Sequence, residues 1–289
     1  MRGRIVALSC GFYSVNGDDG ILYRVKARGL FRNHGQKPTV GDIVELDDAT
    51  LVIHEIYPRT AYLKRPPVSN ISQLLIIQSL TEPEFSYHLI FKYLTYANLN
   101  GLDAKIILTK SDKFSNQALL DEIKDTFSRL NIPLYFVSNK TKDGVEEVRK
   151  LFANQVTCLI GQSGVGKSSL INAISLDFNR EVGEFSMALG RGKHQTKEVI
   201  LLPYEGGYIV DTPGFSSLDL NLYKEDLAIY FPGFNKLYTE CYFTDCLHIS
   251  ESKCKVKEAI AQGEIPQIAY DNYLKLSSEA IFRNQRYNK

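Results

Sequence analysis

The chain has 289 residues, of which 44% are hydrophobic and 23% are charged, a composition that supports packed cores and favours two or three modest domains. Its formal net charge of +1 argues against a uniformly basic nucleic-acid-binding protein. No run approaches the roughly 18 apolar residues of a membrane span, and residues 1–5 lack the apolar core of a secretory signal, so we expect a cytoplasmic protein without a membrane segment.

The first part of the chain has the pattern of a small β-barrel. Short apolar runs with β-branched and aromatic residues predict strands at 3–8 and 20–25; residues 38–46 alternate as a fourth strand, and 51–56 is the candidate for a fifth. Turn-forming residues lie at 11, 16–17 and 18–20. Five short strands in about 60 residues are typical of an OB-type barrel, although composition alone fits an SH3-like barrel equally well.

Charge is unevenly distributed along this part. Residues 1–40 contain seven Lys or Arg and two Asp, whereas residues 41–56 contain five acids and no Lys or Arg. Such segregation can present a basic face to a phosphate backbone, or it can simply be a solvated surface.

A strand–helix alternation follows a boundary at Lys64-Arg65-Pro66-Pro67. The pattern predicts strands at 74–77, 104–108, 134–137 and 156–160, and helices at 86–100, 115–130, 144–153 and 168–175. A strand pair, 198–203 and 207–211, follows, and a further helix is expected within 217–230. Such an alternation indicates a mostly parallel α/β sheet with helices on both faces.

A phosphate loop of the pattern G-x-x-x-x-G-K-[ST] lies between one of these strands and the next helix. Its glycines let backbone N–H groups approach phosphates, and the helix N-terminus favours their negative charge. Lys167 is expected to reach the β- and γ-phosphates, and Ser168 to ligate Mg²⁺. The nucleotide-binding residues predicted in this segment are Gly161, Gln162, Ser163, Gly164, Val165, Gly166, Lys167, Ser168 and Ser169.

A guanine-reading motif, Thr109-Lys110-Ser111-Asp112, precedes the phosphate loop. The Asp112 carboxylate can accept hydrogen bonds from N1–H and the 2-amino group of guanine, which adenine does not offer. Ser138 follows the next strand, where a loop with Asn139 and Lys140 would cover guanine O6. In ordinary small GTPases this motif comes after the phosphate loop. Counting from strand 156–160 and wrapping back to residue 71 restores the six-strand order, so we predict a circularly permuted P-loop GTPase domain.

Two switch segments are predicted beyond the phosphate loop. Asp211 closes a strand and can hold Mg²⁺, and Gly214 can turn its N–H toward the γ-phosphate. Between the phosphate loop and Asp211, residues 190–197 carry two glycines and three Lys or Arg, and Thr196 is the candidate for the second Mg²⁺ ligand. His194 is either catalytic or an exposed switch residue. The predicted catalytic residues are therefore Lys167, Thr196 and His194.

The last part of the chain contains Cys241, Cys246, His248 and Cys254, spaced C-x4-C-x-H-x5-C. In a cytosolic chain this spacing favours one structural Zn²⁺ over disulfides, the alternative being unlinked buried cysteines. Cys10 and Cys158 lie in apolar strands and are expected in the core. Helices are predicted at 254–262 and 266–284, which gives domains at 1–63 (barrel), 64–220 (GTPase) and 221–289 (mostly helical, zinc-binding).

The whole chain resembles the bacterial ribosome small-subunit-dependent GTPase A family. The resemblance is carried by segments 28–32, 40–42, 64–70, 161–169, 190–196 and 211–215 and by the Cys/His set. It implies a monomeric GTP hydrolase with Zn²⁺ and Mg²⁺ that acts late in 30S maturation, is stimulated by that subunit, and contacts 16S rRNA through barrel and zinc domain. Phe215 stands where many GTPases have Gln, and the resemblance offers His194 to position water.

Two other readings remain open at this point. One is a zinc-dependent RNA-binding module with a vestigial nucleotide site, against which the intact Lys167, Ser168 and Asp112 argue. The other is an adenine-using ATPase or kinase, which Asp112 disfavours because adenine would leave its carboxylate unpaired.

Overall fold

The computed structural model describes residues 1–9, 11–28, 31, 37–64, 66–174, 185, 199–211, 218 and 220–281. The chain forms two compact units, each taken by itself below. The first comprises Met1–Leu75, Lys142–Gly161 and Lys167–Ser216, and the second comprises Ile76–Thr141, Gln162–Gly166 and Ser217–Lys289. No helix in these described ranges is both long and apolar enough to cross a bilayer.

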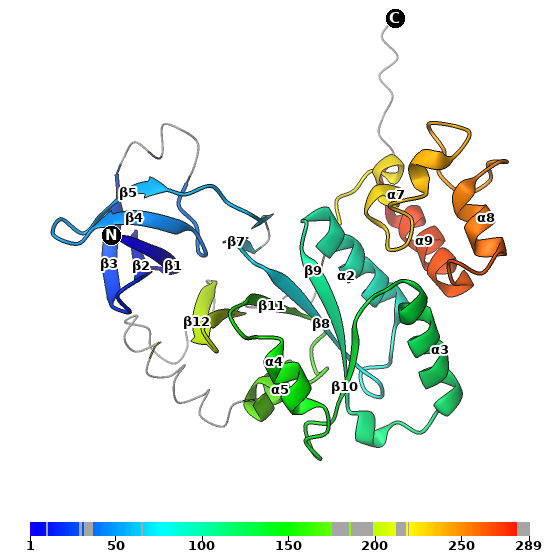
Figure 1. The fold of residues 1–289 in the computed structure, drawn as a ribbon, viewed down its shortest axis with the longest axis horizontal. Helices are drawn as coiled ribbons and strands as arrows, with labels where there is room; N and C mark the ends of the chain where they lie inside the picture. The colour runs from blue at the N-terminus through cyan, green and yellow to red at the C-terminus, as the bar shows by residue number, and fades with distance from the viewer. Residues whose placement is uncertain are drawn as a thin grey trace, which may run out of the picture. The chain divides into compact units, whose positions relative to one another are not determined.

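Five strands at the start of the first unit close into a barrel (Figure 1). They are β1 (Arg2–Ser9), β2 (Phe12–Gly17), β3 (Leu22–Ala27), β4 (Ile43–Asp47) and β5 (Val52–Ile56). β1 pairs with both β2 and β4, and β3 pairs with β5 in parallel. This closure is the Greek-key arrangement of an OB-type barrel.

Side chains at alternate positions along these strands fill the interior of the barrel. Its core is apolar and consists of Ile5, Val15, Val25, Val44, Leu46 and Ile53, each at most 1% exposed. The turn predicted at 16–17 is wrong, because Asn16 and Gly17 pair with β1 as the last residues of β2. The turn predicted at 18–20 is confirmed, and Gly17 N donates to Ile21 O across it.

A buried carboxylate ties the barrel to the hairpin β6 (Tyr62–Lys64) and β7 (Pro67–Ser69). Asp42 is fully buried, and Arg59 donates to both of its oxygens at 2.7 and 2.8 Å. Ser69 Oγ and Thr39 N donate to it at 2.6 and 2.8 Å. Gly41 adopts φ +94° directly against the Ser69 backbone, so a side chain at this position would collide with it.

The first unit also holds β11 (Val156–Ile160), β12 (Ile200–Tyr204) and β13 (Gly207–Asp211). β13 pairs in parallel with β11 and antiparallel with β12. The chain just before β8 (Gln73–Ser79) lies beside β11, because Ser72 N donates to Val156 O at 3.0 Å. In the sequence, the helix α4 (Val145–Lys150) precedes β11, and α5 (Lys167–Ile174) follows it.

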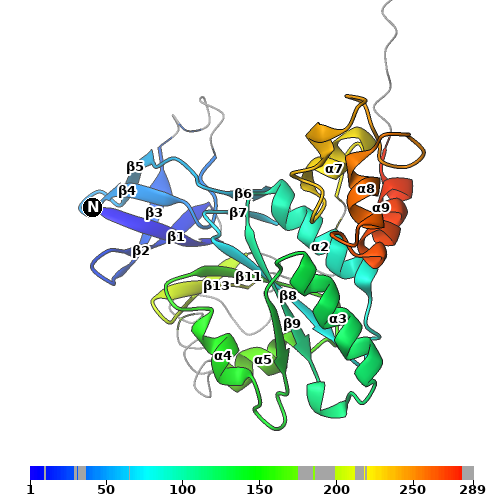
Figure 2. The same ribbon diagram turned by 45° about the vertical axis from the view of Figure 1, so that its right-hand side comes forward.

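In the second unit, β8 continues beside β9 (Asp103–Thr109), which pairs in parallel with β10 (Leu134–Val137). The helices α2 (Tyr87–Leu99) and α3 (Gln117–Arg129) follow β8 and β9 in the chain (Figure 2). Each begins at a capping side chain: Ser86 accepts from Leu89 N and Asn116 from Leu119 N. Both helices start within two residues of the predicted positions.

The C-terminal region of the second unit is mostly helical. It contains the 3₁₀ turns η2 (Lys224–Asp226) and η3 (Tyr238–Glu240) and the helices α7 (Leu227–Tyr230), α8 (Lys255–Ala261) and α9 (Gln267–Glu279). The predicted extension of the last helix to 284 is wrong, since Ala280 has extended backbone angles. The helix expected within 217–230 is present only as η2 and α7.

An aromatic cluster anchors this region to α2. Phe91 of α2 stacks on Phe231 with ring centroids 5.3 Å apart, and Phe231 packs on Phe234 at 4.8 Å and on Tyr273 of α9 at 5.3 Å. All four side chains are fully buried. The C-terminal helices therefore share one core with α2.

The strand order confirms the permutation. Within the second unit the order is β10-β9-β8, and within the first unit β11, beside the residues that lead into β8, is followed by β13 and β12. The strand that ends in the guanine motif therefore precedes the phosphate-loop strand in the chain by two strands. The sheet is that of a P-loop GTPase whose chain begins at a different strand.

Candidate nucleotide-binding and metal sites

The guanine motif begins at the end of β9, where the backbone leaves the sheet abruptly. Lys110 takes the left-handed conformation, with φ +60°, and the turn η1 (Ser111–Lys113) carries Asp112. Ser138, directly after β10, donates its hydroxyl to Asp112 Oδ1 at 2.7 Å and accepts from Thr141 N at 3.0 Å. The structure thus brings together Asp112 and Ser138, which the sequence placed after adjacent strands.

The same motif contacts the middle of the phosphate loop. Thr109, fully buried, donates Oγ1 to Val165 O at 2.5 Å. Lys110 Nζ donates to Gly164 O at 3.2 Å and also to Glu82 O. Two predicted base-binding residues and two predicted phosphate-binding residues are therefore held in one hydrogen-bonded group.

The glycines of the loop have the backbone angles that the pattern requires. Gly164 and Gly166 have φ +81° and +98°, which side-chain-bearing residues rarely adopt. Lys167, at the start of α5, donates Nζ to Gly161 O at 2.5 Å, and burial lowers the pKa of its ammonium group. Ser163, Ser168 and Ser169 are exposed, and Gln162 is half-buried.

The switch residues are only partly described. Asp211 is the last residue of β13, where it is exposed and lies opposite Ile200 of β12. Gly214, His194 and Thr196 fall outside the described residues, as do Phe215 and Cys10. Cys158 is fully buried in β11, where burial raises the pKa of its thiol to about 12, in keeping with a core position.

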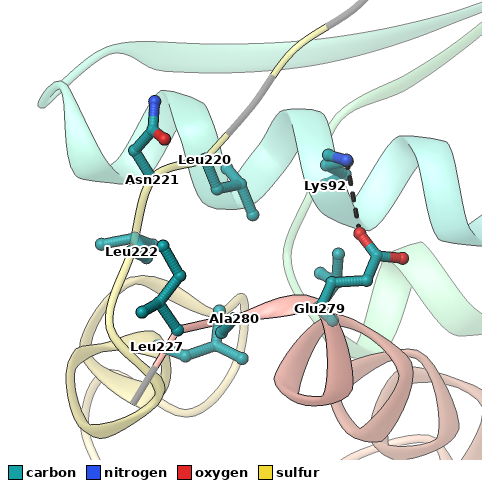
Figure 3. Close-up of a pocket in the computed structure, with 9 residues that line it drawn as sticks. Lys92, Leu220, Asn221, Leu222, Leu227, Glu279 and Ala280 are labelled. Carbon is teal, nitrogen blue, oxygen red and sulfur yellow. Dashed lines mark hydrogen bonds and ion pairs between the residues drawn. The ribbon is translucent and has the colours of Figure 1, made fainter. Parts of the chain in front are cut away.

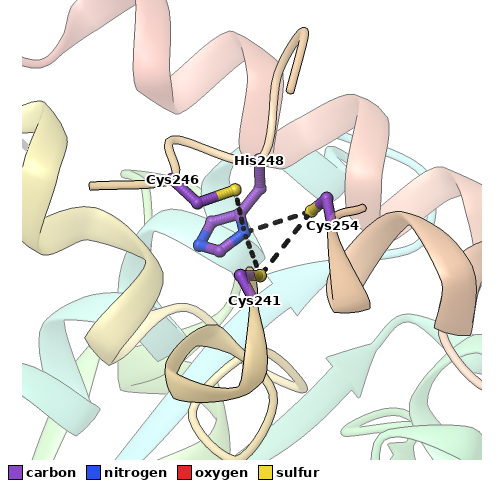
Figure 4. A group of neighbouring side chains, drawn as sticks. All are labelled: Cys241, Cys246, His248 and Cys254. Carbon is purple, nitrogen blue, oxygen red and sulfur yellow. Dashed lines mark hydrogen bonds between the residues drawn. The ribbon is translucent and has the colours of Figure 1, made fainter. Parts of the chain in front are cut away.

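The four zinc candidates converge on one point (Figure 4). Nδ1 of His248 lies 3.5 Å from Sγ of Cys241, 3.5 Å from Sγ of Cys246 and 3.3 Å from Sγ of Cys254. Sγ of Cys241 and Cys254 are 3.9 Å apart. A tetrahedral zinc with ordinary bond lengths requires S···S and S···N separations of about 3.8 and 3.5 Å. The donor set and its spacing therefore fit Zn²⁺, with Nδ1 as the imidazole ligand.

Burial sets the protonation of three of the four candidate ligands. Burial raises the pKa of the Cys246 thiol to about 12 and raises that of Cys254, so their thiolates need a cation to form. Burial also lowers the pKa of His248, which keeps the neutral form that ligates metals.

Three residues that the sequence analysis missed position the metal-binding loop. Tyr270 and Tyr273 of α9 donate their hydroxyls to His248 O and Leu247 O at 2.9 and 2.8 Å. The Glu251 carboxylate accepts from Leu247 N and Ile249 N at 2.8 Å each. Glu251 lies between the ligands at 248 and 254, so the motif spacing marked its segment but not its role.

A separate small cavity lies where α2 meets the end of α9 (Figure 3). It has a volume of about 160 Å³ and is lined mainly by aliphatic side chains, four of them leucines, and Lys92 donates to Glu279 at 3.4 Å. None of the predicted site residues lines it.

The permuted sheet, the phosphate loop before α5 and the guanine motif after β9 define a circularly permuted P-loop GTPase with an N-terminal five-stranded barrel and a C-terminal helical region bearing a Cys₃His cluster. Comparison with known families agrees: the RsgA GTPase model matches residues 56–221 and the RsgA N-terminal domain model matches residues 2–50. The chain belongs to the RsgA GTPase family and is a GTP hydrolase.

Relatives match along the whole chain. It is 38% identical to the small ribosomal subunit biogenesis GTPase RsgA of Halalkalibacterium halodurans over 291 residues, covering 99% of each chain. It is 41% identical to the protein of the same name from Streptococcus agalactiae over 293 residues, covering 100% of this chain and 98% of the relative.

Solved structures show the same fold. YjeQ from Thermotoga maritima matches with a TM-score of 0.82 and 34% identity, covering 96% of this chain and 97% of YjeQ. YloQ, described as a circularly permuted GTPase, matches with a TM-score of 0.79 and 33% identity, covering 96% and 94% of the two chains.

Proposed function

We propose that this protein hydrolyses GTP during maturation of the small (30S) ribosomal subunit in the cytoplasm and that the subunit stimulates the hydrolysis. The contact from Thr109 Oγ1 to Val165 O carries the nucleotide part of this proposal, because it joins the guanine motif to the phosphate loop. The ribosomal part is supported by relatives of matching length that are named for small-subunit biogenesis.

In this proposal the phosphate end of the site is built from the loop and its helix. Backbone N–H groups of residues 161–169 bind the phosphates, and Lys167 neutralises the β- and γ-phosphates. Ser168, Thr196 and Asp211 would hold Mg²⁺, which supplies charge neutralisation between the phosphates. Gly214 would turn its N–H to the γ-phosphate.

At the base end, Asp112 accepts from guanine N1–H and the 2-amino group, and the Ser138 hydroxyl orients that carboxylate. Thr109 and Lys110 hold the motif against the loop. Attack on the γ-phosphate needs a positioned water, which Phe215 cannot orient by hydrogen bonding. We assign that role to His194 and propose that the ribosomal subunit completes the active site, so turnover by the protein alone is slow.

The barrel offers a face for 16S rRNA. Arg24 and Lys26 are exposed on the same face of β3, on either side of the buried Val25 in the sequence. Their charged groups lie 4.3 and 5.0 Å from the ring centroid of Phe12 on β2. Cations beside an aromatic ring suit a phosphate backbone with unpaired bases. We assign rRNA contact to this barrel (1–63) and to the zinc domain (221–289), which precede and follow the GTPase domain (64–220) in the sequence, and we propose that the protein is a monomer.

Zinc is proposed as a structural ion held by Cys241, Cys246, His248 and Cys254. Four protein ligands fill a tetrahedral site and leave no position for substrate. Its contribution is to fix residues 241–254 against α9, where Tyr270 and Tyr273 already hold the loop backbone.

Substitution of Asp112 by Asn tests the base assignment. An amide cannot accept both guanine donors, but it can donate to the 2-carbonyl of xanthine. We therefore expect Asp112→Asn to lose GDP affinity and gain affinity for xanthosine diphosphate, measured by fluorescence titration. Asp121→Asn, on the exposed face of α3, is the matched control and should leave both affinities unchanged. Wild-type binding of ADP as tightly as GDP would contradict the assignment.

A further inference from the structure

An asparagine beside the guanine motif has an unused amide. Asn139 follows Ser138 after β10, and its Oδ1 is buried without a hydrogen-bond partner among the described residues. Its Nδ2 faces the phosphate loop: a Cβ built on Gly166 would lie 3.4 Å from Nδ2 of Asn139 and 3.7 Å from Oγ1 of Thr109. Oδ1 is an acceptor, whereas Nδ2 is the donor end of this amide, and Nδ2 is the atom that lies where three nucleotide-binding segments meet.

Guanine presents two acceptors, N7 and O6, on the edge beside the donors that Asp112 takes. The neighbouring side-chain donors of the described chain are already engaged. The Ser138 hydroxyl is donated to Asp112, and the Thr109 hydroxyl is donated to Val165 O. The Lys110 ammonium points to the carbonyls of Glu82 and Gly164.

Lys140, the next cation along the loop, is exposed and its ammonium is free to stay in water. The amide of Asn139 is therefore the half-buried donor best placed for this edge of the base.

We propose that Nδ2 of Asn139 donates a hydrogen bond to N7 of the bound guanine, while backbone N–H groups of the same loop take O6. The inference rests on the proposed guanine site. Thr109 and Asn139 then have complementary roles: Thr109 binds the phosphate loop, and Asn139 binds the base. Adenine also carries N7, so Asn139 adds affinity, whereas discrimination between the bases stays with Asp112.

A pairing of protein variant and nucleotide analogue tests the contact. GDP and 7-deaza-GDP differ only in N7, which the analogue replaces with C–H. We expect the full-length wild type to bind GDP about two- to twelvefold more tightly than 7-deaza-GDP, as one net hydrogen bond gives. Asn139→Ala should bind the two with equal affinity. Asn235→Ala removes an exposed amide in the zinc region and should keep the wild-type ratio.

Equal losses of both nucleotides in Asn139→Ala would overturn the inference, since they would show a structural effect only. Asn139→Asp gives a second reading if the alanine variant does not fold: its carboxylate repels the N7 lone pair, so GDP should weaken more than 7-deaza-GDP. A wild type that binds ADP as well as GDP would instead refute the guanine site itself, which separates the two failures.

Discussion

Thr109→Val removes the hydrogen bond that joins the guanine motif to the phosphate loop, together with the longer contact of the same hydroxyl to Gln78 O at 3.3 Å. The substitution keeps the shape of the side chain and removes the hydroxyl that donates to Val165 O at 2.5 Å. Both residues are fully buried, so water cannot replace the lost partner. Leaving a buried carbonyl without its donor costs about 1–3 kcal/mol of unfolding free energy. The phosphate loop should also lose its fixed position, which weakens GDP binding.

Thr95→Val is the matched control within the same unit. Thr95 is equally buried, and its hydroxyl donates to Phe91 O at 2.7 Å, one turn back along α2. That carbonyl keeps its helical N–H partner after the substitution, so the cost should stay within about 0.5 kcal/mol. Urea midpoints at a shared m-value give both free energies, and fluorescence titration gives the GDP affinities. Equal losses in the two variants would refute the reasoning.

Two further substitutions test other parts of the structure. Cys254→Ser should abolish the roughly one zinc ion per chain that metal analysis of the wild type should find, because a hydroxyl does not replace a thiolate ligand; retained zinc would contradict the Cys₃His site. Asp42→Ala should lower the unfolding free energy by about 1–3 kcal/mol because Ser69, Thr39 and Arg59 lose the buried carboxylate to which they donate. Arg149→Ala, which breaks the two exposed ion pairs to Glu146 and Glu205, should shift the midpoint far less, and equal shifts would argue against a buried anchor.

The sequence predicted the elements of the sheet because their signals are local. A buried strand such as β8 has seven consecutive buried residues, and its apolar run is unmistakable. The phosphate loop and the guanine motif are also contiguous in the chain. Their order alone indicated the permutation, which the strand pairings confirm.

Features that depend on distant contacts escaped prediction. β2 (Phe12–Gly17) has no clear apolar alternation, and it extends through Gly17 because β1 pairs with it up to Gly3. The last helix is shorter than its amphipathic pattern, since Ile281 N donates to Leu222 O and continues the chain as an isolated bridge. The spacing of apolar residues in the sequence indicates neither the pairing of Gly17 with β1 nor the contact of Ile281 with Leu222.

The sequence predicted the Cys₃His ligand set of the metal site, but not the residues that hold the metal-binding loop in place. The roles of Glu251 and Tyr273 depend on hydrogen bonds to the backbone of the metal-binding loop, for which no sequence motif exists. The tasks of Thr109 and Asn139 likewise emerge only once β9, β10 and the phosphate loop lie together. The roles of His194, Thr196 and Gly214 stay predictions.

GTP turnover by the purified protein, with and without 30S subunits at fixed salt, tests the central claim most directly. We expect slow turnover alone, strong stimulation by 30S subunits, none by 50S subunits, and no turnover in Lys167→Ala. Rapid turnover that is indifferent to either subunit would contradict the account, because the active site would then be complete without a ribosomal partner.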